Sequence, residues 1–240
     1  MKPEVELVRL QRIAWVLIAM LLLVSAFQLR PYRFDTRDVG VSLEAFERDR
    51  IVLMNMGLVR IMILFPATML AAAMARRFAV GSVAAFLLVG AAISGLAGIA
   101  QTLIGLPAEE YRPDHADSHS IEVIGDVLFW THDNLVILGG LALVAGSFSF
   151  SVWMWKQRRR QWWVYPGLAA LPLLALATLS WYLTDPADVT VAGRHTPTVA
   201  SSIEAPWYSG FSGAALVCFV VWLAAMARWA DRGEDSISES

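Results

Sequence analysis

Three of the four histidines lie in one short stretch, DHADSHSIEVIGDVLFWTHDN, which covers residues 114–134 and also holds five carboxylates. His115 and His119 are four residues apart, so on a helix their imidazoles share a face, and Glu122 follows three residues later. His132 stands thirteen residues after His119. Because converging imidazoles suit copper, zinc, iron and nickel alike, the pattern predicts a transition-metal site without choosing the ion.

A shared site requires the chain to reverse direction. We expect the segment after His119 to fold back and to enter the membrane at Asp126, which places His132 about two helical turns below that point and beneath the other two histidines. The alternative is a polar loop that is merely solvated, because histidine-rich tracts are only compositional evidence. His132 is followed directly by Asp133 inside an apolar run. Such a position is costly to keep without a role, which favours the metal site.

Other kinds of chemistry have no support in the sequence. It contains no HExxH, GxSxG, P-loop or GxGxxG motif, so protease, hydrolase and nucleotide sites are not indicated. The single cysteine, Cys218, excludes an intrachain disulfide and any CxxC motif. A formal net charge of -2 without a basic surface block gives no indication of nucleic-acid binding.

The elements that must position these residues are membrane helices. Apolar residues make up 57% of the 240 residues, charged residues only 17%, and the mean hydropathy is +0.55, all typical of an integral membrane protein. Six apolar segments are each long enough, at about 20 residues, to cross a bilayer. We therefore predict one all-α domain, a polytopic membrane helix bundle, followed by a disordered acidic tail over residues 231–240. The predicted spans lie near residues 12–29, 51–75, 79–104, 126–155, 163–184 and 206–230.

The first span is interpreted as a retained helix, because no small-x-small cleavage site of a signal peptide follows it. With six spans both termini lie on the same side of the membrane. Eleven Lys and Arg residues fall on that side and seven in the opposite loops, so we predict cytoplasmic termini. All four histidines then collect at the exocytoplasmic face of the cell membrane.

Two charged residues lie within the predicted spans. Arg60 and Asp133 sit at similar depths, about two turns inward from the outer ends of spans two and four. A charge at the bilayer centre costs at least ~2.5 to 3.5 kcal/mol, and such charges are usually paired or near water. We predict a structural ion pair between them. The alternative is that Arg60 snorkels to the interface alone.

The order of these features resembles the C subunit of the membrane-bound copper monooxygenases, the family of particulate methane, ammonia and short-chain hydrocarbon monooxygenases. In that family a loop helix carries an aspartate and, four residues later, a histidine, and a second histidine follows thirteen residues beyond. His119 and His132 keep the thirteen-residue interval within SHSIEVIGDVLFWTH, and His115 stands in the place of the aspartate. The segment DVGVSLEAFERDR is similar to the family's Gly-Leu-Asp segment with its Phe-Glu helix.

The resemblance implies that His115, His119 and His132 hold a copper ion, with Asp114 or Asp117 as an alternative first ligand and zinc as a possible occupant. The metal centre itself would be the catalytic group, oxidising a small apolar substrate such as methane, ammonia or a short-chain hydrocarbon with O2. It also implies two partner subunits, of the A and B types, in a trimer of heterotrimers.

A second metal position is implied less completely. The stretch GRHTPTVASSIEAPWYSGF resembles the family's Gly-His-Thr segment, and on that basis His195 matches one ligand of the second metal position. Val191 replaces the family's asparagine, and Tyr208 stands where a later histidine is expected. These departures put the second site in doubt.

Two other functions fit the same layout. The first is a non-enzymatic six-span membrane protein whose histidines are surface decoration or a pH sensor. The second is a metal or proton transporter with an intramembrane relay through Arg60, His132 and Asp133. The relay is the weaker alternative, because the inner half of the predicted membrane region offers no charged steps.

Overall fold

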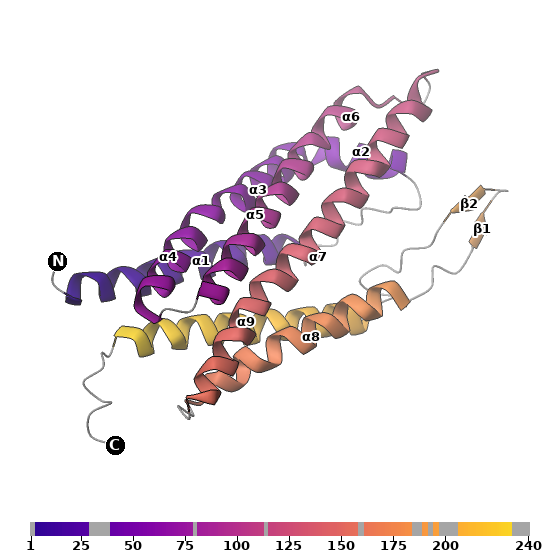
Figure 1. The fold of residues 1–240 in the computed structure, drawn as a ribbon. Helices are drawn as coiled ribbons and strands as arrows, with labels where there is room; N and C mark the ends of the chain where they lie inside the picture. Colours follow the sequence, from indigo (N-terminus) through magenta and orange to yellow (C-terminus); the bar gives the residue numbers. More distant parts are fainter. Residues whose placement is uncertain are drawn as a thin grey trace.

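The computed structural model describes residues 3–28, 39–78, 81–112, 115–157, 161–183, 189–191, 194–196 and 206–231, which form a helical bundle with one small hairpin (Figure 1). The first helices are α1 (Pro3–Gln28), α2 (Val39–Arg48), α3 (Arg50–Met62), α4 (Leu64–Phe78) and α5 (Gly81–Leu103). They are followed by α6 (Gly105–Glu110), α7 (Ser118–Lys156), α8 (Val164–Leu183) and α9 (Pro206–Asp231). Strands β1 (Val189–Val191) and β2 (Arg194–Thr196) pair antiparallel.

The predicted helical bundle is confirmed, and the described residues of the six predicted segments lie largely in helices. Among the described residues four segments are long and apolar enough to cross a membrane: Arg50–Phe78, Gly81–Glu110, Ser118–Lys156 and Gly210–Ala230. Shorter apolar stretches, Leu10–Ser25 and Val164–Ser180, lie in α1 and α8. The predicted acidic tail lies outside the described residues apart from Asp231, which ends α9.

Prolines explain why two long rods are each divided into two helices. Pro66 and Pro107 have no N–H to donate to the residue four positions earlier, which is Met62 at the end of α3 and Leu103 at the end of α5. The neighbouring backbone bonds continue across both positions, from Ala67 N to Ile63 O at 3.2 Å and from Ala108 N to Ile104 O at 3.1 Å. Each pair of helices therefore forms one nearly continuous rod.

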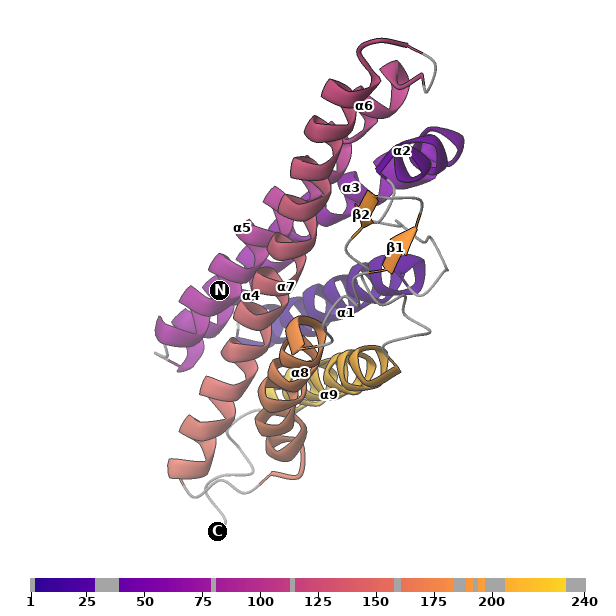
Figure 2. The ribbon, with the colours of Figure 1, turned by 90° about the vertical axis from the view of Figure 1, so that its right-hand side faces the viewer.

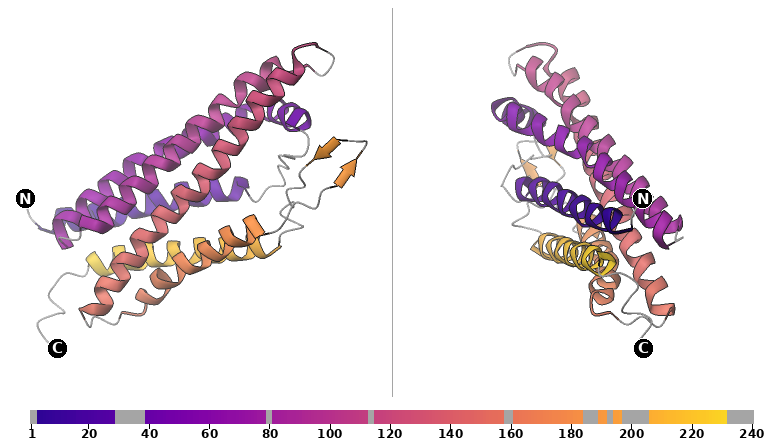
Figure 3. Two further views of the ribbon diagram at one scale, coloured as in Figure 1. Left: turned by 45° about the vertical axis from the view of Figure 1, so that its right-hand side comes forward. Right: turned by 90° about the vertical axis from the view of Figure 1, so that its left-hand side faces the viewer.

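The bundle has two distinct ends (Figures 1 and 3). Helix α1 begins at one end of the bundle, and helices α4, α7 and α9 finish there. We call this the basic end, because it carries Arg76, Arg77, Lys156 and Arg228. Helices α2 and α6, the start of α7 and the hairpin lie at the other, which we call the histidine end because His115 and His119 are there. The long rods α3–α4, α5 and α7 pack together, and α8 and α9 pack beside them with α1 (Figure 2).

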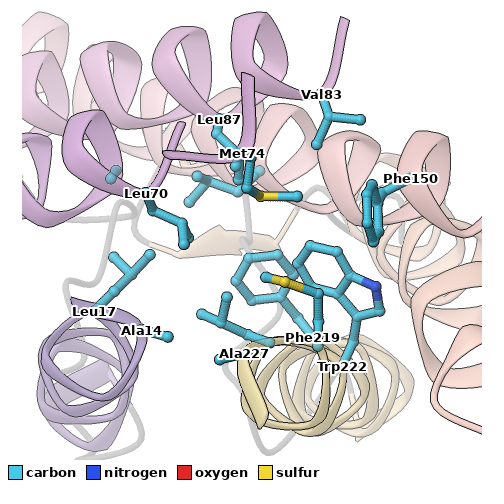
Figure 4. Packing of buried hydrophobic residues seen from close by; sticks show 14 of the residues in the cluster. Ala14, Leu17, Leu70, Met74, Val83, Leu87, Phe150, Phe219, Trp222 and Ala227 are labelled. Carbon is cyan, nitrogen blue, oxygen red and sulfur yellow. The ribbon is translucent and has the colours of Figure 1, made fainter. Parts of the chain in front are cut away.

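Apolar side chains fill two separate clusters. The larger cluster joins α1, α4, α5, α7, α8 and α9 toward the basic end and includes Leu17, Leu70, Met74, Leu87 and Trp222 (Figure 4). The smaller cluster lies at the histidine end, where α2 buries Leu43 and Phe46 completely against residues of α6 and α7. The second cluster anchors the α2 and α6 region to the rods that carry the candidate site.

Candidate functional site

The predicted reversal of the chain between His119 and Asp126 is wrong. Residues Ser118–Lys156 form one continuous helix, α7, of 39 residues. The cause is that a charged residue such as Asp126 does not break a helix, and no proline stands between Ser118 and Lys156. His119 and His132 thus lie on a single helix, and thirteen residues at about 1.5 Å each separate them by roughly 20 Å along its axis.

The histidines at the start of α7 face water. His115 lies exposed in the turn before the helix, and the side chain of His119 is 88% exposed, with Nδ1 at 3.9 Å from Glu122 Oε2. Asp117 is exposed as well, and Asp114 lies outside the described residues. Across the described ranges, no group of three or more His, Cys, Asp or Glu side chains is placed to hold a metal ion. The described part of the chain therefore does not fit one copper or zinc ion shared by His119 and His132.

Carboxylates near these histidines join neighbouring helices. The hydroxyl of Tyr111, which is buried at the end of α6, donates to Glu122 Oε1 at 2.9 Å. Arg50 at the start of α3 forms an ion pair with Glu109 of α6, with an Nη2–Oε2 distance of 2.9 Å. Both contacts tie α6 to a long rod, which is a structural role that the sequence pattern did not reveal.

A second group of polar side chains lies deeper, between α3, α5 and α7. Arg60, Gln101 and His132 are only 5%, 7% and 8% exposed. Arg60 Nε donates to Gln101 Oε1 at 3.2 Å, and Gln101 Nε2 donates to Leu53 O at 3.0 Å. We call Arg60, Gln101, His132 and the adjacent, partly buried Asp133 the outer polar cluster. Gln101 was missed in the sequence, where its only signal is an amide in an otherwise apolar span.

Two glycines bring Arg60 and Gln101 together. A methyl group added to Gly57 of α3 would lie 2.8 Å from the carbonyl oxygen of Gly98 on α5, so the two backbones touch there. Arg60 and Gln101 each follow their glycine by three residues, but α3 and α5 run in opposite directions, so the two residues lie on opposite sides of this contact along the helix axes and their long side chains span it. The close approach of small residues, which is common where membrane helices pack, therefore sets the distance between the two polar side chains.

His132 is held in a defined orientation. Its Nδ1 lies 3.0 Å from the carbonyl oxygen of Ala97 on α5. A carbonyl can only accept, so Nδ1 carries the proton in this contact, and in the neutral ring Nε2 keeps its lone pair. The charge of Arg60 acts on both His132 and Asp133, which places a cation beside the imidazole and the carboxylate. A direct ion pair between Arg60 and Asp133 stays a prediction.

The depth of the cluster follows from helix geometry. The 22 residues from Asn134 to Trp155 carry no charge and extend about 33 Å, enough for a hydrocarbon core of about 30 Å. His132 and Asp133 then lie at the boundary of that core. The first fourteen residues of α7, from Ser118 to Thr131, extend about 21 Å beyond it. His132 is buried because α5 packs against it through Ala97, whereas the side chain of His119 at the start of α7 is left exposed.

The residues proposed for a second metal position are only partly described. The backbone of His195 lies in β2 opposite Thr190 of β1, and Val191 lies opposite Arg194. The side chains of His195 and Tyr208 fall outside the described part of the structure. The second site therefore stays a prediction.

No protein-family model, curated protein or solved structure matches this chain. The resemblance to the copper monooxygenase C subunit thus stays a prediction from the sequence. The candidate site is identified only by the contacts and burial of its residues. That geometry singles out the outer polar cluster, because it joins three helices through buried polar side chains at one depth.

Proposed function

We propose that this chain is a six-span integral membrane subunit with cytoplasmic termini, and that its functional site is the outer polar cluster. The observation that carries the proposal is the hydrogen bond from His132 Nδ1 to Ala97 O. Ionisable residues inside a membrane span are costly and are functional candidates by default. A histidine whose Nδ1 is held by a backbone carbonyl presents Nε2 in the orientation that metal-ligating histidines use.

The setting that we propose is a copper-dependent monooxygenase complex, on the strength of the sequence resemblance. Within it His132 Nε2 is the ligand that the described part of this chain supplies, and neighbouring subunits supply others. Bound copper would provide the O2 chemistry. The chain's own residues orient the ring through Ala97 and exclude water around it. The carboxylate of Asp133 would offset the unfavourable effect of the Arg60 charge on a nearby cation.

Metal analysis of the complex purified from native membranes tests the proposal. His132→Ala is expected to remove the copper that this chain helps to bind, whereas His119→Ala, an exposed residue of the same helix, is expected to leave it in place. Mass spectrometry of the same sample identifies the accompanying chains. Full copper content in the His132→Ala complex, or purification of the wild-type chain without partners and without metal, would overturn the proposal.

A metal-free helical scaffold is the second candidate. The specific observation in its favour is the charge of Arg60 beside His132, which disfavours a cation there. In a scaffold the cluster only holds α3, α5 and α7 together. The wild-type protein would then contain no metal, and His132→Ala would change its stability alone.

A transporter has less support. Residues 61–75, 82–100 and 134–155, the described portions of the rods between the cluster and the basic end, contain no charged side chain. A proton or metal relay from the outer polar cluster therefore has no charged step along these segments.

A further inference from the structure

A groove at the basic end of the bundle lies far from the outer polar cluster. It is formed by α1, α9 and the turn before α8, and its volume is about 570 Å³. Helices α1 and α9 lie side by side in the views of Figures 2 and 3 and are in contact. The residues that line the groove include Gln11, Trp15, Gln161, Trp162, Trp163 and Arg228.

The polar groups of the groove are suited to an anion. Arg228 is the one charged residue among those that line it. A guanidinium is a planar donor that binds phosphate oxygens in pairs, and it keeps its charge at any physiological pH. Gln11 and Gln161 add neutral amide groups, so the described lining contains no carboxylate that would repel an anion.

A buried donor lies in the same wall. Trp163 is only 2% exposed, and its indole nitrogen has no hydrogen-bond partner among the described residues. An indole N–H can only donate, and a buried donor without a partner is unfavourable. The ring itself is held by stacking on Phe150, with centroids 6.0 Å apart. Trp163, one of the residues that line the groove, therefore holds a fixed donor that lacks an acceptor.

The rest of the lining is suited to lipid. Trp15 and Trp162 are 54% and 63% exposed, as amphipathic rings at the depth of the headgroups are. The groove is at the end that carries Arg76, Arg77 and Lys156, and basic pockets between membrane helices bind anionic headgroups. We infer that this groove binds the phosphate headgroup of an anionic phospholipid, with Arg228 as the charged contact and Trp163 as a neutral donor.

The experiment measures the thermal stability of the purified full-length protein in a neutral detergent, with added phosphatidylglycerol or phosphatidylcholine. Phosphatidylglycerol is expected to raise Tm and phosphatidylcholine is not. Arg228→Gln is expected to weaken the apparent lipid affinity about tenfold, as loss of a charge-assisted hydrogen bond does. Arg76→Gln, an exposed arginine of the same end outside the groove, is the matched control and is expected to keep the affinity.

Trp163→Phe gives a second readout. It removes the N–H but keeps an aromatic ring against Phe150, and it is expected to weaken phosphatidylglycerol binding severalfold. Inorganic phosphate is the test for a free anion, and it is expected to give no stabilisation at equal concentration. Equal losses in Arg228→Gln and Arg76→Gln would show general attraction to a basic surface and would overturn the inference. So would stabilisation by phosphatidylcholine, or by phosphate alone.

Discussion

At the basic end, aromatic side chains of α4, α7, α9 and the turn before α8 pack ring against ring, whereas at the other end α3, α5 and α7 are joined by buried polar groups. Phe150 stacks on Trp153 and Trp163, with centroids at 5.4 and 6.0 Å, and meets Trp222 edge-on at 6.1 Å. Toward the histidine end, α3 is joined to α5 by the contact of Arg60 with Gln101, and α5 to α7 by that of His132 with Ala97.

The two arrangements differ in what they require. Aromatic packing is stabilised by contact area and by about 0.5 to 1.5 kcal/mol per ring pair, and many apolar arrangements satisfy it. Buried polar groups must each find a partner in the right direction, since an unpaired one is destabilising. Joining helices through the outer polar cluster therefore places stricter requirements on geometry than aromatic packing does. The presence of this cluster in one half of the bundle only is the reason to look for function there.

The largest expected effect is on the aromatic end. Trp222 is fully buried against Phe150 and Phe219, so Trp222→Ala is expected to lower the free energy of unfolding by about 3 to 5 kcal/mol. Denaturant unfolding in detergent, followed by circular dichroism, measures the change. Trp162→Ala, at a 63% exposed position, is the control and is expected to have little effect. Similar losses in both variants would contradict the importance of the ring packing.

The second effect is on the contact that aligns the polar cluster. Gly98→Ala places a methyl group against the backbone of Gly57 and 2.9 Å from Arg60 Cβ, so α3 and α5 must separate. We expect a loss of about 2 kcal/mol in the same unfolding assay, as for overpacking of a core.

The matched control is Gly95→Ala, on the same helix, where an added methyl group meets nothing within 4 Å. It is expected to be neutral or slightly stabilising, because alanine is the better helix former. A Gly98→Ala protein as stable as Gly95→Ala would mean that the close approach of α3 and α5 is not needed.

The positions of the helices were predictable from the sequence because a run of about 20 apolar residues has few ways to satisfy its backbone in lipid. The predicted span 51–75, for example, lies within the observed Arg50–Phe78. The start of α7 is not predictable in this way, because the apolar run that begins near Asp126 marks where the chain enters the membrane and not where the helix begins. A helix can begin in water well before it reaches lipid, and α7 does so at Ser118.

The site was predicted only in part. Arg60, His132 and Asp133 stood out because charged and imidazole groups inside apolar runs are rare. Their connection through Gln101 depends on the contact of Gly57 with Gly98, two residues 41 positions apart in the sequence. Small residues at helical spacing predict that a helix will be approached, but not by which neighbour.

The third prediction concerns the coupling between Arg60 and Gln101. A double-mutant cycle with Arg60→Met and Gln101→Leu is expected to give an interaction energy of about 1 kcal/mol, the order found for hydrogen bonds between membrane helices. Unfolding of the four proteins under one set of conditions provides the values. An interaction energy near zero would show that the 3.2 Å contact contributes nothing to stability.

The smallest effect is expected at His119, and it separates the two histidines of α7. The His119 side chain is 88% exposed, and its ion-pair distance to Glu122 is long, at 3.9 Å. His119→Ala is therefore expected to leave the unfolding curve of the purified chain unchanged. His132→Ala removes the bond to Ala97 O inside the bundle and is expected to shift the curve measurably. If His119→Ala were the more destabilising variant, its imidazole would have to be held by a contact beyond those of the single chain. A metal or a partner subunit at the histidine end would then become the better explanation for the cluster of histidines and carboxylates that begins α7.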